Sequence, residues 1–365
     1  MRNSTRTVRD DNEFLVAEDF AGLCSLVSSM NRSVKDAVKN GKCVGHCKVK
    51  GQYASEIRAE LQPMVHHWFN SLVDSDCTAR SEWYNLLRAT EVDVYGAGWP
   101  CQPWSNAGEK GGSKDLRHKG PFFSMLDFLK VKRPKIAVLE NVHVVQLQKQ
   151  LMKQLQQALR AAGYVWAIHT INTNAYVPQN RLRTYIVAVL SNVGTQHDVD
   201  TCFQNEPDES SALDDLLSLN VDEHWFTASQ ALAAHTGIVF HRNFKHAEDA
   251  LTKNLADECF AVADFGASAQ RPVATVDECP CITAARGAQK RLWVLHCKRN
   301  HIVKLRPLTH TELLALQGWQ SPEIATIMSN VKATSLGHAI GNGMSQCVLS
   351  TITDWAVELL QKARV

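Results

Sequence analysis

One cysteine of this chain lies in a conformationally stiff segment. Residues 96–105 read GAGWPCQPWS, which places Cys101 between Pro100 and Pro103. Each proline ring fixes its backbone φ angle near about −65°, so the segment resists relaxing away from whatever it contacts. A thiolate is a strong nucleophile, but most cysteines of globular proteins are inert, buried and apolar in behaviour. Cys101 is therefore a candidate nucleophile if neighbouring elements supply the other groups that such chemistry needs.

A carboxylate at the end of an apolar run is the first such group. Glu140 and Asn141 directly follow Ile136–Leu139, which reads IAVL. A carboxyl group in this position can exchange a proton with a substrate, or it can cap the helix that follows. For an isolated motif both interpretations stay open.

The segment 177–183, VPQNRLR, supplies cations. Gln179, Arg181 and Arg183 alternate along it, so their side chains point to the same side if the segment is extended. Two guanidinium groups and an amide on one face suit contact with a phosphate or a base. The structural alternative is the polar edge of a strand.

The elements that would position these groups follow a strand and helix rhythm. Short β-branched runs at Val92–Tyr95 and Ile136–Leu139 predict buried parallel strands. Residues 164–176 and 183–190 predict two further strands. Between them a helix is predicted from leucines spaced four apart, with Gly163 as its stop: Leu147, Leu151, Leu155 and Leu159. This order predicts an α/β sheet with helices on both faces, whose ligands bind at the carboxyl ends of the strands.

Three segments are predicted along the chain. The rhythm holds over residues 13–190, fails over 191–305, and is followed by a segment, 306–365, that returns to the first domain. A closing helix is predicted there from residues that share one helical face: Met344, Val348, Ile352, Trp355, Leu359 and Leu360. The middle segment is expected to be a second domain with short strands.

Charge is distributed unevenly in the middle segment. Residues 191–241 contain nine acidic residues and no Lys or Arg, whereas 286–306 contain seven Lys or Arg and no acid. A polyanion would be attracted to the second stretch, although two solvated surfaces of opposite sign would give the same pattern.

Composition bounds the class of protein. No apolar run approaches the roughly 20 residues that span a bilayer, and the first residues lack the apolar stretch of a secretory signal. The eleven cysteines are irregularly spaced, which predicts reduced thiols and an intracellular protein. The clusters CVGHC (43–47) and CPC (279–281) lack paired zinc-ligand spacing, so no metal is predicted.

Five motifs resemble, in order and spacing, those of the cytosine-C5 DNA methyltransferases. They are GWPCQPWSNAG, LENV, VPQNRLR, RPLTHTELLALQGW and AIGNGMSQCV, and the resemblance extends from about Phe14 to Ile352. It implies an α/β fold with a Rossmann-like sheet that binds S-adenosylmethionine, helices on both faces of that sheet, and a smaller mixed target-recognition domain. Residues 191–305 take the place of that domain, and their basic end would contact phosphates or base edges of double-stranded DNA.

The resemblance also implies roles for the candidate residues. Cys101 would add to C6 of a cytosine flipped out of the duplex, and Glu140 would contact N3 of that base. Arg183 would hold the flipped cytosine and its phosphate, with Arg181 beside it. Further contacts with the substrate are expected from Gln179, Asn141 and Ser105.

The methyl-donor residues carry over from the same family with two departures. In EDFAGLC, Cys24 stands where a second glycine is common, and Gly343 replaces a common serine after Asn342. The donor site is nonetheless expected to comprise Phe20, Gly22, Glu56, Ile57, Asp76, Pro100 and Asn342.

Other functions stay open at this stage. A tRNA cytosine methyltransferase uses the same chemistry, and Cys281–Thr283 (CIT) faintly resembles the Cys-Phe-Thr signature of that branch. A silent nucleic-acid-binding homologue is motivated by the departures at Cys24 and Gly343. A nicotinamide-dependent oxidoreductase is disfavoured because the first loop has no Gly-x-Gly-x-x-Gly pattern. The expected compartment is the nucleus for a eukaryotic source and the cytoplasm for a bacterial one.

Overall fold

The computed structural model describes residues 13–19, 25–40, 48–53, 92–99, 116–204, 211–217, 224–251, 258–268, 274–299 and 301–364. The chain divides into two compact units. The first unit comprises Met1–Ile171, Arg183–Asn205 and Val348–Val365, and the second comprises Asn172–Leu182 and Glu206–Cys347. Each unit has its own hydrophobic core.

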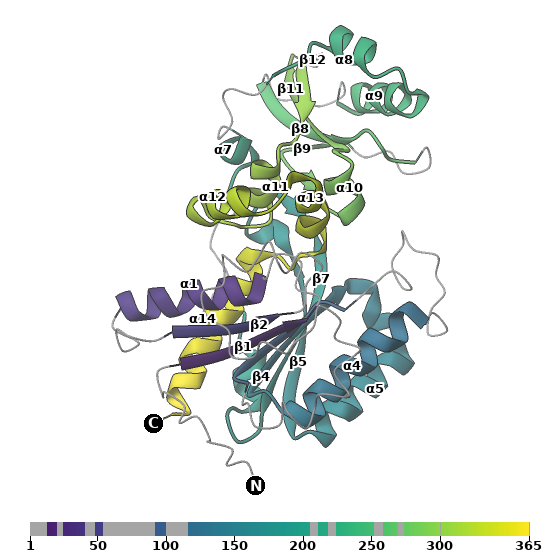
Figure 1. The fold of residues 1–365 in the computed structure, drawn as a ribbon. Helices are drawn as coiled ribbons and strands as arrows, with labels where there is room; N and C mark the ends of the chain where they lie inside the picture. The colour runs from purple at the N-terminus through teal and green to yellow at the C-terminus, as the bar shows by residue number, and fades with distance from the viewer. Residues whose placement is uncertain are drawn as a thin grey trace. The chain divides into compact units, whose positions relative to one another are not determined.

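The first unit is built on a six-stranded sheet with the order β2-β1-β3-β4-β7-β5 (Figure 1). Its strands are β1 (Glu13–Asp19), β2 (Lys48–Tyr53), β3 (Val94–Ala97), β4 (Ile136–Val142), β5 (Tyr164–Asn172) and β7 (Leu182–Leu190). The first four strands in this order pair in parallel, and β7 runs antiparallel to β4. Nearly every residue of β3 and β4 is buried, as their apolar β-branched runs predict.

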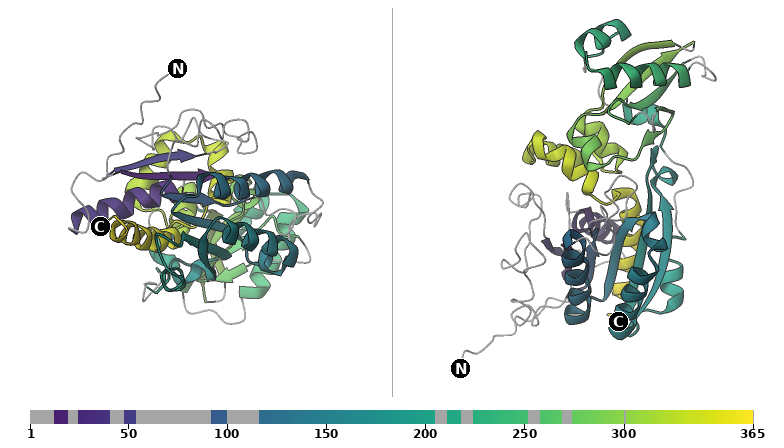
Figure 2. Two further views of the ribbon diagram at one scale, coloured as in Figure 1. Left: turned by 90° about the horizontal axis from the view of Figure 1, so that it is seen from below. Right: turned by 90° about the vertical axis from the view of Figure 1, so that its right-hand side faces the viewer.

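One face of this sheet is covered by α1 (Ser25–Lys39) and α14 (Gln346–Lys362), which lie side by side (Figure 2). The hydroxyl groups of Ser29 and Ser33 each lie 2.8 Å from the hydroxyl group of Thr353, so polar contacts join the two helices within the core. The sheet approaches α1 closely, because a Cβ atom at position 96 would collide with Leu26. A larger residue than Gly96 would therefore require the Leu26 side chain to move.

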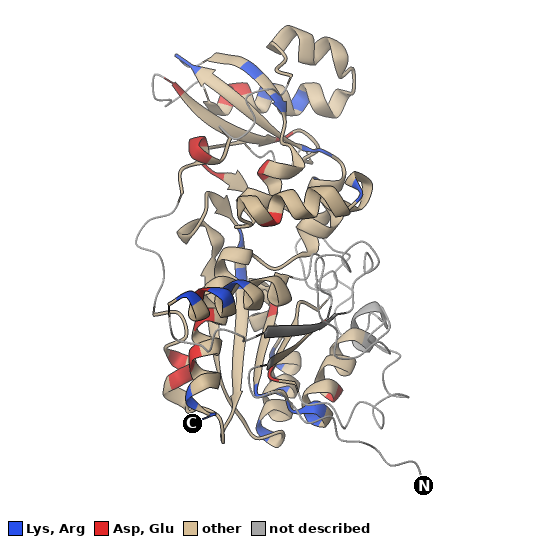
Figure 3. Cartoon of the chain, turned by 60° about the vertical axis from the view of Figure 1, so that its left-hand side comes forward, with Lys and Arg blue, Asp and Glu red and all other residues tan. Residues whose placement is uncertain are grey.

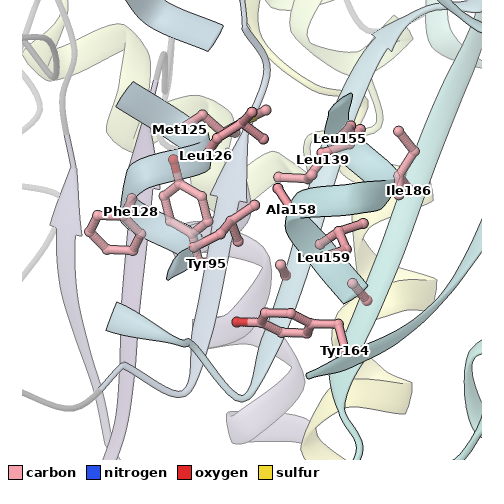
Figure 4. Packing of buried hydrophobic residues seen from close by; sticks show 14 of the residues in the cluster. Tyr95, Met125, Leu126, Phe128, Leu139, Leu155, Ala158, Leu159, Tyr164 and Ile186 are labelled. Atoms are coloured by element: carbon pink, nitrogen blue, oxygen red, sulfur yellow. The ribbon is translucent and has the colours of Figure 1, made fainter. Parts of the chain in front are cut away.

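The opposite face is covered by α4 (Leu116–Lys132) and α5 (Lys149–Ala161). Neighbouring residues of a strand point to opposite faces. Next to Gly96, Tyr95 accordingly stacks on Phe128 of α4, with ring centroids 4.3 Å apart (Figure 4). The Tyr164 hydroxyl group donates to the Pro134 carbonyl at 2.6 Å, and burial raises the pKa of this phenol well above its usual value. Helices therefore lie on both faces, which confirms the predicted fold class.

The helix predicted from the leucine spacing begins later than that spacing indicates. Leu147 ends a short 3-10 helix, η4 (His143–Leu147), and is 74% exposed. The chain is non-helical at Gln148, and α5 then buries Leu151, Leu155 and Leu159. Gly163, with a φ of 86°, lies just past its end and confirms the predicted stop.

The second unit contains an antiparallel sheet with the order β12-β11-β8-β9. Its strands are β8 (Glu258–Asp264), β9 (Ala274–Val276), β11 (Leu292–Lys298) and β12 (His301–Pro307). Two helices, α8 (Ala228–Ala234) and α9 (Ile238–Leu251), contribute side chains to its core. The sequence prediction of short strands omitted these helices, although Phe240, Phe244, Ala247 and Leu251 have the helical spacing that would have indicated α9.

The remaining elements of the second unit are short. A two-residue strand from the VPQNRLR motif, β6 (Gln179–Asn180), pairs in parallel with β10 (Cys279–Pro280). The helices are α7 (Leu213–Leu217), α10 (Ala284–Ala288), α11 (His310–Leu316), α12 (Ser321–Asn330) and α13 (Ala333–Asn342). In the first unit, α6 (Gln196–Asp200) follows β7.

The contact-based division differs from the three predicted segments. Helices α11, α12 and α13 lie within the second unit, so the chain returns to the first unit at Val348 rather than near residue 306. The predicted return helix is α14, and of its predicted face Val348, Ile352, Leu359 and Leu360 are buried. An amphipathic pattern shows that a helix has a buried face but not which unit covers it.

Among the described residues, no helix has both the length and the apolar character needed to cross a membrane.

Candidate functional site

A buried ion pair lies where β4 ends and β7 begins. Arg183 Nε is 3.0 Å from Glu140 Oε1, and the two side chains are only 14% and 10% exposed. In the ladder Glu140 lies opposite Tyr185 and Val142 lies opposite Arg183. Glu140 and Arg183 are therefore diagonal neighbours on the same face of the sheet, close enough for long side chains to meet. The sequence predicted both residues for the site, and the fold brings them together.

Asn141, on the opposite face of β4, reaches the segment that follows β3. Its amide Nδ2 donates to the main-chain carbonyl of Trp99 at 3.0 Å, and its Oδ1 accepts from the Val142 N–H at 2.9 Å. Asn141 is 2% exposed and Trp99 is likewise 2% exposed, so the bond is shielded from water. Trp99 precedes Cys101 by two residues. Asn141 thus fixes the chain just before the candidate nucleophile; Pro100, Cys101 and Ser105 themselves lie outside the described residues.

A third contact supports the start of β7, and no sequence pattern predicts it. Gln146 of η4 donates through Nε2 to the hydroxyl groups of Thr170, at 2.5 Å, and Thr184, at 2.7 Å. These bonds join η4, β5 and β7 directly beside Arg183. A glutamine in a polar run carries no pattern that distinguishes it from a solvated residue, so only the fold reveals this role.

Gln179 and Arg181 belong to the second unit, whereas Arg183 belongs to the first. Gln179 is fully buried; its Nε2 donates to the Leu316 carbonyl at 2.5 Å, and its Oε1 accepts from the Ile282 N–H at 3.3 Å. Arg181 is 2% exposed and donates to the carbonyls of Ile282 and Gly343, each at 2.9 Å. The sequence predicted that Gln179, Arg181 and Arg183 point to the same side. The common contact of Gln179 and Arg181 at Ile282 is in accord with this for two of the three. The described partners of these two side chains are main-chain atoms, together with the Cys281 Sγ atom, which lies 3.8 Å from Arg181 Nη1.

The basic stretch 286–306 is less available to a polyanion than its sequence indicates. Arg286 and Arg291 both bind the carboxylate of Asp264, with Nε to oxygen distances of 2.8 and 3.1 Å. Arg306 forms a two-point pair with Glu312, at 2.8 and 2.6 Å, in which both side chains are at most 1% exposed. Three of the seven cations are thus paired with buried acids from outside the stretch, Asp264 and Glu312.

Four cations of the same stretch remain at or near the surface. Lys290, Lys298 and Arg299 are exposed, and Lys304 is half-buried. Lys298 lies 3.3 Å from Glu258 and the Lys304 ammonium lies 4.5 Å from the centre of the Trp225 ring. Among the described residues, basic and acidic positions both occur along the second unit (Figure 3).

Of the predicted donor residues, the structure describes only Asn342. It is exposed near the end of α13, and its Nδ2 lies 3.2 Å from His338 Nδ1. At the end of β1, Glu18 accepts a hydrogen bond from the Val27 N–H at 3.1 Å and so ties that strand to α1. Phe20, Gly22, Glu56, Ile57, Asp76 and Pro100 lie outside the described residues.

Several other thiols are in unreactive surroundings. Burial raises the pKa of Cys202 and of Cys297 to about 12, and it also raises the pKa of Cys259 and of Cys279. A thiol with a raised pKa is protonated at neutral pH and is a poor nucleophile. These four cysteines are therefore structural, and Cys101 stays the candidate nucleophile.

The largely parallel sheet, with helices on both faces, defines an α/β protein, a class whose ligands bind beyond the carboxyl ends of the strands. The sequence model of the C-5 cytosine-specific DNA methylases matches residues 41–354. The chain belongs to this family.

Individual relatives agree with this assignment. The chain is 37% identical over 178 residues to the type II methyltransferase M.BanI of Aneurinibacillus aneurinilyticus, a match that covers 47% of this chain and 37% of that protein. It is 33% identical over 136 residues to the type II methyltransferase M.NlaX of Neisseria lactamica, which covers 36% and 42% of the two chains. The chain therefore matches less than half of the length of these relatives.

Two solved structures share the fold. The Entamoeba histolytica methyltransferase EhMeth has a TM-score of 0.61 at 16% sequence identity, with 94% of this chain and 98% of that chain covered. The S. pombe Dnmt2 methyltransferase has a TM-score of 0.57 at 14% identity, with 96% and 98% covered.

Proposed function

We propose that this chain transfers a methyl group from S-adenosylmethionine to C5 of a cytosine flipped out of DNA, through a bond between Cys101 Sγ and C6 of the base. The observation that carries the proposal is the buried Glu140–Arg183 pair at the end of β4. Asn141, the next residue of the strand, holds the chain at Trp99, two residues before Cys101. A carboxyl group and the segment of a candidate nucleophile therefore lie at adjacent strand ends of the first unit, as the family's chemistry requires.

The reaction can be followed through the residues of the chain. The Cys101 thiolate forms the Sγ–C6 bond, and the displaced electron density is stabilised by a proton that Glu140 shares with N3. The base is then nucleophilic at C5, which takes the methyl group. Loss of the C5 proton to a base restores the C5=C6 double bond, the Sγ–C6 electron pair returns to sulfur, and Glu140 recovers its proton. Cys101 and Glu140 are left as they began.

Arg183 contributes orientation. The 3.0 Å contact from its Nε fixes one oxygen of the Glu140 carboxyl group, and burial of the pair prevents water from competing for that contact. The Gln146 bonds to Thr170 and Thr184 hold β7 in place beside it. A carboxyl group held in this way meets N3 in one geometry, which is what rapid proton exchange needs.

S-adenosylmethionine, when bound, supplies the methyl group as an electrophile. Asn342 fits a residue that meets such a ligand, because it is exposed on the second unit and carries an amide, whose Nδ2 atom lies 3.2 Å from His338 Nδ1. By resemblance the other residues that would hold the donor are Phe20, Gly22, Glu56, Ile57, Asp76 and Pro100.

The DNA backbone would be contacted by the surface cations of the second unit. Because Arg286, Arg291 and Arg306 are engaged with Asp264 and Glu312, the phosphate contacts fall to Lys290, Lys298, Arg299 and Lys304. Each phosphate contact adds close to one unit to the slope of log affinity against log salt. Lys290→Gln should reduce that slope. Arg306, which is buried against Glu312, should not contribute to the slope.

The test is covalent trapping on a duplex that contains 5-fluorocytosine. Fluorine replaces the C5 proton whose loss releases the enzyme, so an active enzyme stays bonded to the DNA after methyl transfer. We expect a denaturation-resistant adduct from the wild-type chain with donor, and none from Cys101→Ser. A wild-type chain that binds the duplex and the donor but forms no adduct would show a silent homologue and overturn the proposal.

A tRNA transcript incubated in parallel separates the second substrate. In the structure Ile282, the centre of the Cys281–Thr283 segment, is fully buried and bonded to Gln179 and Arg181. This gives the segment a structural role that needs no RNA. Methyl transfer to the transcript alone would nevertheless assign the activity to tRNA.

A further inference from the structure

A buried polar cluster within the second unit joins segments that are far apart in the sequence. We define it as Thr173, Gln179, Arg181, Gln317 and Ser345. All five residues are at most 2% exposed, and Gln179 and Ser345 are fully buried. They come from the VPQNRLR region, from the end of α11 and from the segment after α13. Buried polar groups of this kind are expensive unless they are satisfied, so their bonds define the local geometry tightly.

Arg181 is the charged member of the cluster and binds the chain on both sides of Asn342. Its Nη2 donates to the Gly343 carbonyl at 2.9 Å, and its Nη1 lies 3.5 Å from the Gly341 carbonyl. The same Nη1 donates to the Ile282 carbonyl at 2.9 Å. Hydrogen bonds from a charged donor are roughly twice as strong as neutral ones.

The other members hold the chain immediately outside these two carbonyls. Gln317 Nε2 donates to the Ile340 carbonyl at 3.0 Å, and the Gln317 carbonyl accepts from the Gln346 N–H at 2.7 Å. The hydroxyl group of Ser345 lies 2.9 Å from that of Thr173. Every residue from 340 to 346 except Asn342 and Met344 is thus held by a described contact of this kind, whereas Asn342 is exposed.

Close backbone contact adds to this restraint. A Cβ atom at position 341 would collide with the main chain of Thr283 and Ala284, so only glycine fits there. The carbonyls that Arg181 binds therefore belong to a segment that can lie against α10 and has little room to shift.

We propose that Arg181 is a positioning residue for the segment 340–346: it fixes the main chain on both sides of Asn342, so that the Asn342 amide is presented in one orientation to the methyl donor. This rests on the proposed function, which gives Asn342 its role. The resemblance placed Arg181 beside the flipped cytosine. In this inference Arg181 instead holds the segment 340–346, so it affects the affinity for the methyl donor rather than the binding of the cytosine. Arg183, two residues along the chain, acts on Glu140 instead.

The first experiment measures hydrogen exchange of Arg181→Lys without any ligand. Lysine keeps the charge but cannot reproduce the planar two-nitrogen contact with Ile282 and Gly343. We expect amide exchange in the segment 340–346 to become about tenfold faster, because bonds from a charged donor are lost. The matched control is Arg183→Lys, which should leave that segment unchanged. Equal exchange in wild type and Arg181→Lys would overturn the positioning role, whatever the activity of the chain.

The second experiment measures binding of S-adenosylmethionine by calorimetry, alongside turnover. Arg181→Lys should raise the Kd of the donor about tenfold, with a matching rise in its KM, whereas Arg183→Lys should lower kcat at an unchanged donor Kd. Loss of kcat in Arg181→Lys with the donor Kd intact would assign it to the cytosine and refute the inference.

A second variant guards against misfolding of Arg181→Lys. Gln317→Met has a similar volume and removes two bonds of the side chain, the one to the Ile340 carbonyl at 3.0 Å and the longer one from the Ser345 hydroxyl group at 3.4 Å. It should raise the donor Kd about threefold, as expected when neutral hydrogen bonds are lost and no charged one is. An unchanged Kd in Gln317→Met would count against the inference. If the wild-type chain does not bind S-adenosylmethionine at all, the proposed function is refuted, and so is the part of the inference that links Arg181 to the donor. The hydrogen-exchange experiment would still test whether Arg181 fixes the segment 340–346.

Discussion

Two regions that draw on one short motif differ in what their side chains contact. At the end of β4 in the first unit, Arg183 meets the Glu140 side chain, and both are slightly accessible. In the polar cluster of the second unit, Arg181 meets main-chain carbonyls and is 2% exposed. A side chain that contacts another side chain can be redirected toward a substrate, whereas one that binds backbone fixes the shape of the chain. The two arginines of VPQNRLR thus differ in role: Arg183 belongs to the proposed reacting site, and Arg181 belongs to the polar cluster, which we call the frame because it holds backbone in place.

This comparison gives a rule that substitutions can test. Changes at the β4 end of the first unit should lower the rate of reaction at nearly constant stability. Changes in the frame of the second unit should lower stability or order first, with the rate following.

The largest effect is expected for Glu140→Gln. The amide keeps the size of the side chain and can still meet Arg183, but it cannot share a proton with N3. Loss of a general acid costs about 10³-fold in rate, so single-turnover methyl transfer should slow by that factor. The thermal midpoint should fall less than in Glu312→Gln, because the Glu140 and Arg183 side chains stay partly accessible to water. Asp127→Asn, at an exposed carboxylate of α4 that is 53% exposed, should leave both quantities unchanged. Full activity of Glu140→Gln would exclude the proposed role of the pair.

The next effect belongs to the second unit. Glu312→Gln would leave the Arg306 guanidinium, 1% exposed, without the carboxylate that it binds at two points. Breaking a buried pair from one side costs about 3 kcal/mol of unfolding free energy, measurable by urea denaturation. The control is Glu258→Gln, whose ion pairs with His296 and Lys298 are exposed and should contribute little. Equal midpoints for the two variants would show that burial of the Arg306–Glu312 pair has no structural consequence.

The comparison also shows which parts of the fold are readable from sequence. The strands β3 and β4 are visible as buried runs and the stop at Gly163 as a helix signal, since these depend on local patterns. The placement of α11 to α13 in the second unit is not visible, because an apolar helix face does not show which other elements it packs against. Nor does the stretch 286–306 reveal that Asp264 and Glu312 will neutralise Arg286, Arg291 and Arg306, since those acids arrive from outside it.

A third prediction concerns the contact between α10 and α13. A Cβ atom at position 337 would collide with the Gly287 carbonyl, so the two helices touch through their backbones. Gly337→Ala must push them apart, at a cost of about 2 kcal/mol of unfolding free energy. Gly237→Ala, where a Cβ atom would meet nothing within 4 Å, is the control in the same unit. If both variants unfold at the same urea concentration, the helices are not held at the distance described.

The candidate site was predictable to a similar degree. Glu140 and Arg183 could be predicted because a motif marks them and strands β4 and β7 happen to be neighbours. For Arg181 the motif suggested contact with the substrate, but its described bonds are to backbone carbonyls, which no side-chain pattern records. Gln146 had no signal, since the partners that give it a role are hydroxyl groups on two other strands.

The smallest effect is expected for Asn141→Ala. This variant tests whether Asn141 acts with the reacting groups of the first unit or only holds backbone in place. Asn141 lies in the first unit but binds backbone, as the frame of the second unit does, through its bond to the Trp99 carbonyl. Its removal should cost about 1 kcal/mol of unfolding free energy, the net contribution of one hydrogen bond, and should also slow methyl transfer because the chain before Cys101 loses its anchor. Gln196→Ala removes an exposed side-chain bond to the Trp166 carbonyl in the same unit and should alter neither. A slower reaction without a lower midpoint would place Asn141 with the reacting groups, and a lower midpoint at full rate would place it entirely with the frame.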